Sequence, residues 1–276
     1  MRNQVLVIVA LVCGTPALPA QATATDPWTK VPAAPTTYFG DLDFSRRLLD
    51  LAAELQDLRR QQEEINTRIS VEYQKLGPME IVNRMNAFMM KDPQKAAKMM
   101  EAQQTTATQL NPAAIDAAKR ERNAEFEQLH AAFKADMEAA AKPYQAAREE
   151  IRKTGTVLVL AGADWAFKTK AAETAYNEQI DKENADISAR CAAWFGPSGK
   201  FTAWLASYRS TVIDPMAKGE EGIDGLKVAQ FAMMETPAGA FRSTAQIKAA
   251  REYLQEMGRV FGLRLDKVPN VRKMAG

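Results

Sequence analysis

The chain has 276 residues, of which 46% are hydrophobic and 25% are charged, and this length is ample for a buried core. Its 36 Lys and Arg nearly balance its 34 Asp and Glu, so the overall charge gives no support for nucleic-acid binding. One histidine and two cysteines exclude a multi-histidine zinc centre and a fold held by several disulfides.

The start of the chain has the three parts of a secretory signal peptide. Arg2 is followed by an apolar run from Val5 to Val12 and then by small residues at positions 20–22. We therefore expect residues 1–22 to be removed by cleavage after Ala22, leaving a periplasmic or secreted protein without a transmembrane segment. Cys191 would then be the one cysteine left, either packed as a small apolar residue or available for an intermolecular bond.

Residues 23–40 are rich in Pro, Ala and Thr, which predicts an extended lead-in. The next stretch, Phe44 to Leu76, has the a/d spacing of a coiled coil. We expect one long helix here, ended by Pro78 and by Gly77 in a left-handed cap. The a/d seam predicts a partner helix in this chain, in a second copy or in another protein. The seam residues expected to bind that partner are Leu48, Leu51, Leu55 and Leu58.

A short amphipathic helix is predicted from Met79 to Lys91, in a part of the chain that is rich in methionine. Met79, Met85, Met89, Met90, Met99 and Met100 all fall within residues 79–100. They fit three interpretations: plain core packing, an adaptable surface that binds varied protein partners, or a soft-ligand site for Cu(I). No His or Cys lies nearby, which argues against copper, and we predict no cofactor. Met85, Met89 and Met90 are the residues expected to contact a protein partner. In the alternative hypothesis, the same three residues would bind Cu(I).

Two further long helices are predicted. The first runs from Pro112 to Lys153 behind an Asn111 cap, with a kink expected at Pro143. The second is expected from Asp164 to the Gly196-Pro197 pair.

The run between these two helices, Thr156 to Gly162, is the one segment that favours a strand over a helix. A lone strand needs a partner, and the segment with a comparable pattern is Val260 to Leu265. The alternatives are a buried connector or the first turn of the next helix.

Beyond Ser198 the predicted helices are shorter, over about 199–214, 223–235 and 243–261. The glycine-rich run 219–225 is expected to be a turn, and its acids lack the spacing of an EF-hand. From Arg242 to the end, eight Lys and Arg outnumber three acids. This basic tail would contact an anionic surface weakly or form a solvated helix face.

We find no glycine-rich phosphate loop, nucleophile elbow or paired-cysteine motif in the sequence. A catalytic triad would have to use His130, which lies on a charged helix where a surface histidine is the commoner case. Many pairs of Asp and Glu could serve as general acid and base, but no sequence feature distinguishes one pair from the others. We therefore predict a non-enzymatic protein.

These patterns together predict an all-α, elongated bundle of long antiparallel, coiled-coil-like helices over residues 41–197. A small helical C-terminal region, residues 198–276, would cap it. The expected function is binding to other proteins, or self-association, through the long helices and the methionine-rich turn.

The order of elements over residues 41–165 resembles the periplasmic Skp/OmpH-type holdase chaperones. The shared order is a signal peptide, a helix leading out, a helix returning and a short apolar strand, here Thr156 to Leu160. The resemblance implies a scaffold-like or chaperone-like protein without catalytic residues. This chain departs from that layout in having no strand before the first helix and about 80 additional C-terminal residues.

Overall fold

The computed structural model describes residues 26–35, 42–91, 93–94, 96–97, 101, 111–158, 165–233 and 242–268. Nearly all of these residues are helical, which confirms the predicted all-α class. The predicted signal peptide, Met99, Met100 and the last residues of the basic tail lie outside the described residues. Within the described part of the chain, no helix is long and apolar enough to span a membrane.

The elements follow one another in a simple order. The helices are η1 (Pro27–Lys30), α1 (Leu42–Lys75), α2 (Pro78–Lys91), α4 (Pro112–Gly155), α5 (Lys170–Phe195), α6 (Lys200–Tyr208), the π-helical η2 (Arg209–Ile213), α7 (Asp214–Met233), α8 (Thr244–Val260) and η4 (Leu265–Lys267). Two short strands, β1 (Thr156–Leu158) and β2 (Trp165–Phe167), stand between α4 and α5.

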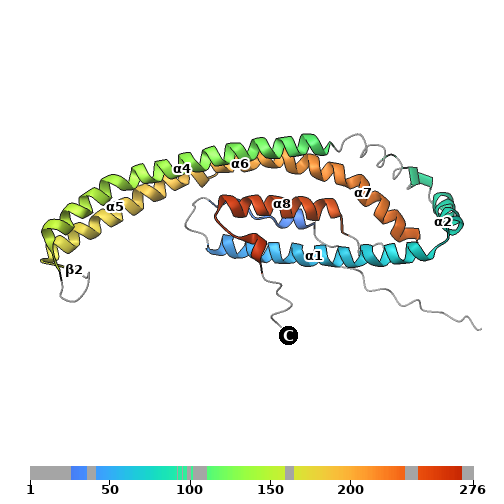
Figure 1. The fold of residues 1–276 in the computed structure, drawn as a ribbon, viewed down its shortest axis with the longest axis horizontal. Helices are drawn as coiled ribbons and strands as arrows, with labels where there is room; N and C mark the ends of the chain where they lie inside the picture. Colours follow the sequence, from blue (N-terminus) through green and yellow to red (C-terminus); the bar gives the residue numbers. More distant parts are fainter. Residues whose placement is uncertain are drawn as a thin grey trace, which may run out of the picture.

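Local signals explain where several of these helices begin. The side chains of Asn111, Thr169 and Ser243 each accept a hydrogen bond from a backbone N–H in the first turn of α4, α5 and α8, respectively. Such caps satisfy amide donors that have no partner within the helix. α4 continues through Pro143 as one helix, and Figure 1 shows it curving gently alongside α5.

Apart from α2, most of the described residues fall into two regions of different thickness (Figure 1). We call the first the body: η1, α1, residues 112–140 of α4, residues 191–195 of α5, α6, η2, α7, α8 and η4. We call the second the arm: residues 141–158 of α4 and β1, together with β2 and residues 170–190 of α5. α8 packs against both α1 and α7, while α4 packs against α5 and α6. A single hydrophobic cluster joins the body elements.

The a/d seam of α1 finds its partner helix inside the chain. α1 packs against α8, and the seam from Phe44 to Leu58 belongs to the main hydrophobic cluster. Leu48 and Leu55 are completely buried, and Leu51 and Leu58 are 5% and 9% exposed. The four leucines predicted to contact a partner therefore contact this chain's own core, because α8 covers the seam.

Gln62, the polar position of the seam, is also buried, at 6% exposure. Its side-chain amide donates a hydrogen bond to the backbone carbonyl of Arg242, which lies just before α8. A buried polar group of this kind needs a partner, and here the partner fixes where the chain enters α8.

The resemblance to the holdase layout led us to expect the outgoing and returning helices to lie together. α4 instead packs along α5, and α1 packs along α8. The long antiparallel pair of the structure is therefore formed by α4 and α5, with a β-hairpin at its tip.

Thr156–Leu158 forms a strand, as the apolar run favoured, but it does not pair with Val260 to Leu265, the partner considered for it. β1 pairs antiparallel with β2, with Thr156 opposite Phe167 and Leu158 opposite Trp165. The segment that we proposed as partner instead holds the last residue of α8 and the start of η4. The helix expected from Asp164 begins at Lys170, because the nearest segment able to satisfy the backbone of β1 is the one that follows it. The rest of the apolar run, 159–162, lies outside the described residues.

Two expectations about glycine were also wrong. The run 219–225 is not a turn but part of α7, where packing against α8 outweighs the weak helix propensity of glycine. Gly77 does not adopt a left-handed cap, since the one glycine with positive φ among the described residues is Gly262, at 71°.

The lead-in is held by aromatic contacts where the structure describes it. The Trp28 ring packs against Tyr253 of α8 at 5.6 Å, and the Arg209 guanidinium lies 4.3 Å from the centre of the Trp28 ring. Arg209 opens the π-helical turn between α6 and α7, and this turn thereby supports η1.

Candidate functional site

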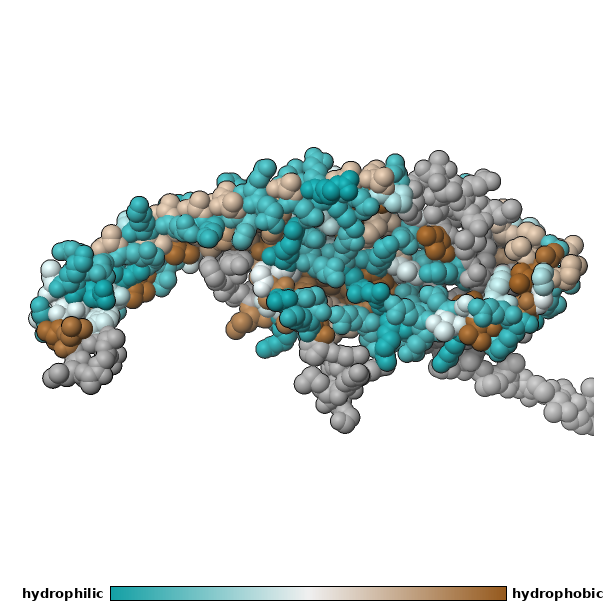
Figure 2. All heavy atoms as spheres, in the orientation of Figure 1, coloured by the Kyte–Doolittle hydropathy of each residue, from teal (hydrophilic) through white to brown (hydrophobic). Residues whose placement is uncertain are grey.

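The surface of α2 is the first candidate for a functional site. No residue of this helix is buried, although its apolar residues gather on one side of the helix. Ile81, Val82, Met85, Phe88 and Met89 lie within about 120° of one another at about 100° per residue, and we call them the α2 apolar face. Val82, Met85 and Met89 are 44%, 45% and 37% exposed. Figure 2 shows hydrophobic residues gathered at this end of the molecule.

The helical positions of the three methionines bear on the copper interpretation. Met85 and Met89 share the α2 apolar face, but Met90 points about 140° away from Met85. Met90 is 83% exposed, as expected for the opposite side of the helix. The three thioethers named as copper ligands therefore do not converge on α2. In the described residues, no group of three or more His, Cys, Asp or Glu side chains has the arrangement of a metal site.

The tip of the arm is a second exposed apolar surface. Leu158 is 83% exposed and Val157 is 49% exposed, both on β1. Behind them, the rings of Trp165, Phe167 and Tyr176 pack against one another at 4.9 to 5.6 Å. These contacts hold the hairpin against α5 and leave Val157 and Leu158 exposed to solvent.

His130 lies on the surface of α4. Its ring stacks on Phe126, one turn earlier, with centroids 6.0 Å apart and the planes 6° from parallel. Phe126 itself is buried in the hydrophobic cluster. The side chain thus covers an aromatic residue at the edge of the core, which agrees with the interpretation of His130 as a surface residue.

Sequence reasoning missed a charged network where α4 and α6 meet α8. Lys119 forms an ion pair with Glu252 at 2.6 Å, and the Tyr208 hydroxyl donates to the same carboxylate at 3.0 Å. Arg259 pairs with Glu256 at 2.8 Å and lies 3.9 Å from the centre of the Phe126 ring. Nothing local in the sequence distinguishes these residues from other charged positions, because α4 and α8 meet only in the fold.

Burial sets the electrostatics of this network. It raises the pKa of Glu256, against the opposing effect of Arg259, and it raises the pKa of the Tyr208 hydroxyl, with Glu252 adding to the shift. Each of the two carboxylates is paired with a cation and each lies between helices. The arrangement joins α4 to α8, and both carboxylates are engaged in these contacts.

The acids of the glycine-rich run serve α8. Asp224 is buried at 6% exposure, and its carboxylate accepts hydrogen bonds from the Ser243 hydroxyl at 2.8 Å and the Ala245 amide at 2.9 Å. Glu220 pairs with Lys248. Two of the three acids in the run therefore bind groups in or just before α8, and Asp224 satisfies one orphan amide group, that of Ala245, at the start of that helix.

Cys191 is 1% exposed, and its sulfur lies 3.9 Å from the sulfur of Met137. Burial raises the pKa of the thiol, and Asp136 contributes in the same direction. Of the two interpretations of Cys191, the structure favours the packed apolar residue, because the thiol is free and buried.

Comparison with models of protein families, with curated proteins and with solved structures found no match for this chain. The candidate sites accordingly stand on their own geometry.

Proposed function

We propose that this is an exported, non-enzymatic protein that binds apolar segments of other proteins through the α2 apolar face. The observation that carries the proposal is the contrast between two amphipathic helices. The seam of α1 is covered by α8, whereas α2 buries no residue and leaves Val82, Met85 and Met89 in solvent. A contiguous exposed apolar surface is typical of a protein-binding site.

The chemistry of the face fits partners of varied shape. Methionine is unbranched and polarisable, so Met85 and Met89 can repack against different side chains at little cost. The ion pair of Glu80 with Arg84 lies at the edge of the face and gives it a polar rim. We therefore expect the partner to contribute an apolar helix or an unfolded apolar segment, as a scaffold or chaperone client would.

The test uses the full mature chain and two double variants of α2. Met85→Glu/Met89→Glu places two charges on the α2 apolar face, while Met79→Glu/Met90→Glu places two charges on the opposite side. Met79 and Met90 are 72% and 83% exposed. We expect the wild type and the Met79/Met90 variant to suppress light scattering by a reduced, unfolded model protein, and the Met85/Met89 variant to lose most of that effect.

Both variants should unfold at the wild-type temperature, because α2 contributes no buried residue. Equal suppression by both variants, or none by the wild type, would show that the α2 apolar face does not bind clients.

A further inference from the structure

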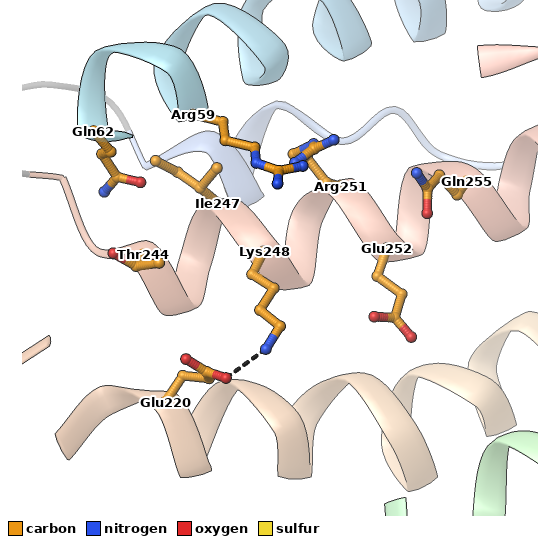
Figure 3. Close-up of a pocket in the computed structure, with 9 residues that line it drawn as sticks. All are labelled: Arg59, Gln62, Glu220, Thr244, Ile247, Lys248, Arg251, Glu252 and Gln255. Atoms are coloured by element: carbon orange, nitrogen blue, oxygen red, sulfur yellow. Dashed lines mark hydrogen bonds and ion pairs between the residues drawn. The ribbon is translucent and has the colours of Figure 1, made fainter. Parts of the chain in front are cut away.

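A cavity of about 420 Å³ lies between α1 and α8, away from the α2 apolar face (Figure 3). Arg59 and Gln62 of α1 line one wall, and Lys248, Arg251 and Gln255 of α8 line the other. Its volume lies within the range of small-molecule sites, about 300 to 1,000 Å³. The lining is rich in groups that donate hydrogen bonds.

Two guanidinium groups meet in this cavity. Figure 3 shows the Arg59 and Arg251 side chains reaching toward one another from facing helices. Their proximity is also evident in the electrostatics, since the charge of Arg59 disfavours the charge of Arg251. Like charges placed face to face are unfavourable unless an anion lies between or beside them.

The other charges around the cavity are largely neutralised. Lys248 points to Glu220 and pairs with it, as the dashed line in Figure 3 indicates. Glu252 is engaged by Lys119 and Tyr208 from outside the cavity.

The two arginines differ in what balances them. Arg59 has an exposed partner in Glu63, one turn along α1, at 2.7 Å. Arg251 forms no hydrogen bond or ion pair with any residue that the structure describes, although it is only partly exposed. The positive charge of Arg251 is therefore the one left without a direct partner in this cavity.

The surroundings of Arg251 make its charge costly. Burial lowers the pKa of its guanidinium, Arg59 lowers it further, and Glu63 only partly opposes them. A partly buried cation facing a second cation decreases stability, and such arrangements persist where a bound ligand compensates for them.

We propose that this cavity binds a small soluble oxyanion, a phosphate or carboxylate compound, held between Arg59 and Arg251. The planar guanidinium fork matches two oxygens of either group, and two forks from facing helices would clamp the anion. Gln255 offers a further amide donor on the α8 wall. The site joins α1 to α8, so its ligand would also stabilise the pairing of the seam helix with its partner.

Isothermal titration of the full mature chain with inorganic phosphate, and separately with citrate, tests the proposal. Ionic strength is held constant with sodium chloride. We expect saturable 1:1 binding of at least one of the two anions, and the two titrations show whether the site prefers phosphate or carboxylate. Arg251→Gln and Arg59→Gln should each weaken binding by about 10-fold or more, because each removes a charge-assisted contact.

Arg60→Gln is the matched control. It removes the same charge from the neighbouring residue of α1, where Arg60 pairs with Asp57 and Glu64 outside the cavity. Binding by Arg60→Gln should stay within about 2-fold of the wild type, as is usual for a surface charge. The Arg59→Gln variant keeps the test informative if Arg251→Gln fails to fold, since the Arg59 side chain is 56% exposed. Absence of saturable binding to both anions, or equal weakening in Arg60→Gln, would overturn the proposal.

Discussion

The body and the arm are built from similar helices but are held together in different ways. In the body, several helices meet, and residues such as Leu55, Phe195 and Val212 lose nearly all contact with solvent. In the arm, α4 and α5 meet only each other, and no described residue in 141–158 or 165–190 is buried. A two-helix hairpin can cover one stripe of each helix and no more. Thickness, more than composition, decides how much each region is stabilised by burial.

The arm compensates in part with specific polar contacts. Arg148 of α4 pairs with Glu183 of α5, and both side chains are shielded, at 16% and 12% exposure. Nearer the body, Asp136 accepts hydrogen bonds from Trp194 at 2.9 Å and Arg190 at 2.7 Å. Such contacts fix the register of two helices but add less free energy than a buried core. We therefore expect the arm to open locally while the body stays folded.

The largest expected effect comes from deleting core volume in the body. Leu55→Ala removes a completely buried side chain of the α1 seam and should lower the free energy of unfolding by about 2 to 5 kcal/mol. Leu42→Ala on the same helix is the control, because Leu42 is 86% exposed and its loss should change stability by about 0.5 kcal/mol or less. Urea denaturation followed by circular dichroism measures both. Similar losses for the two variants would mean that the α1–α8 seam is not the core of the body.

The next effect comes from the turn between α5 and α6, which follows the buried end of α5. A Cβ on Gly199 would overlap the backbone of Trp194 and lie 2.8 Å from the backbone nitrogen of Phe195. Gly199→Ala should therefore destabilise the protein by about 1 to 3 kcal/mol, as overpacking does.

Gly77→Ala is the matched control for that substitution, since nothing lies within 4 Å of the added Cβ and the backbone there has no positive φ. It should be neutral or stabilising by up to about 1 kcal/mol. Thermal unfolding of the two variants distinguishes a specific close approach from a general effect of replacing glycine.

The sequence predicted the helices better than it predicted their partners. Asn111 and Ser243 mark helix starts by local hydrogen bonding, and Pro112 marks one by its fixed φ. That information is present in a few neighbouring residues. The heptad of α1 predicts burial of Leu48 and Leu55, but any helix with an apolar stripe would satisfy it, and the choice of α8 depends on the whole chain. The pairing of β1 with β2 likewise depends on backbone hydrogen bonds that a three-residue strand hardly encodes.

The candidate sites show the same division. The methionine pattern allowed an exposed binding surface as one interpretation, and Met85 and Met89 are exposed in the structure. This could be anticipated because the amphipathic pattern of α2 lies within one short stretch of sequence. The Arg59–Arg251 cavity had no sequence signal, since its two arginines come from α1 and α8 and meet only after those helices pack. A basic C-terminal segment was visible in the composition. It did not show that Arg259 would lie over Phe126, or that Arg251 would have no ion-pair partner among the described residues.

A smaller and local effect is expected from the polar contact in the arm. Glu183→Ala leaves Arg148 without its partner and should speed hydrogen exchange of the arm amides several-fold, equivalent to about 1 kcal/mol, while exchange in the body hardly changes. Glu178→Ala is the control, because its ion pair with Lys182 is 3.8 Å long and solvent-exposed. Faster exchange in α1 and α8 as well would show that arm and body unfold as one unit, contrary to the comparison above.

The smallest effect concerns pH at the boundary between arm and body. The hydrogen bond from Trp194, together with the weaker effects of Arg190 and Lys200, lowers the pKa of Asp136 below its ordinary value of 3.8. A carboxylate with a lowered folded-state pKa stabilises the fold above the unfolded pKa, and this contribution is lost as pH falls through the folded value.

Asp136→Asn keeps an acceptor for Trp194 but cannot titrate. Its stability deficit relative to wild type should therefore be largest near neutral pH and shrink below about pH 4. Urea denaturation across this range measures it, with Glu138→Gln, a 69% exposed carboxylate on the same helix, as the control. A deficit that stays constant with pH would mean that Asp136 joins α4 to α5 through hydrogen-bond geometry alone, and that its charge adds nothing to the boundary.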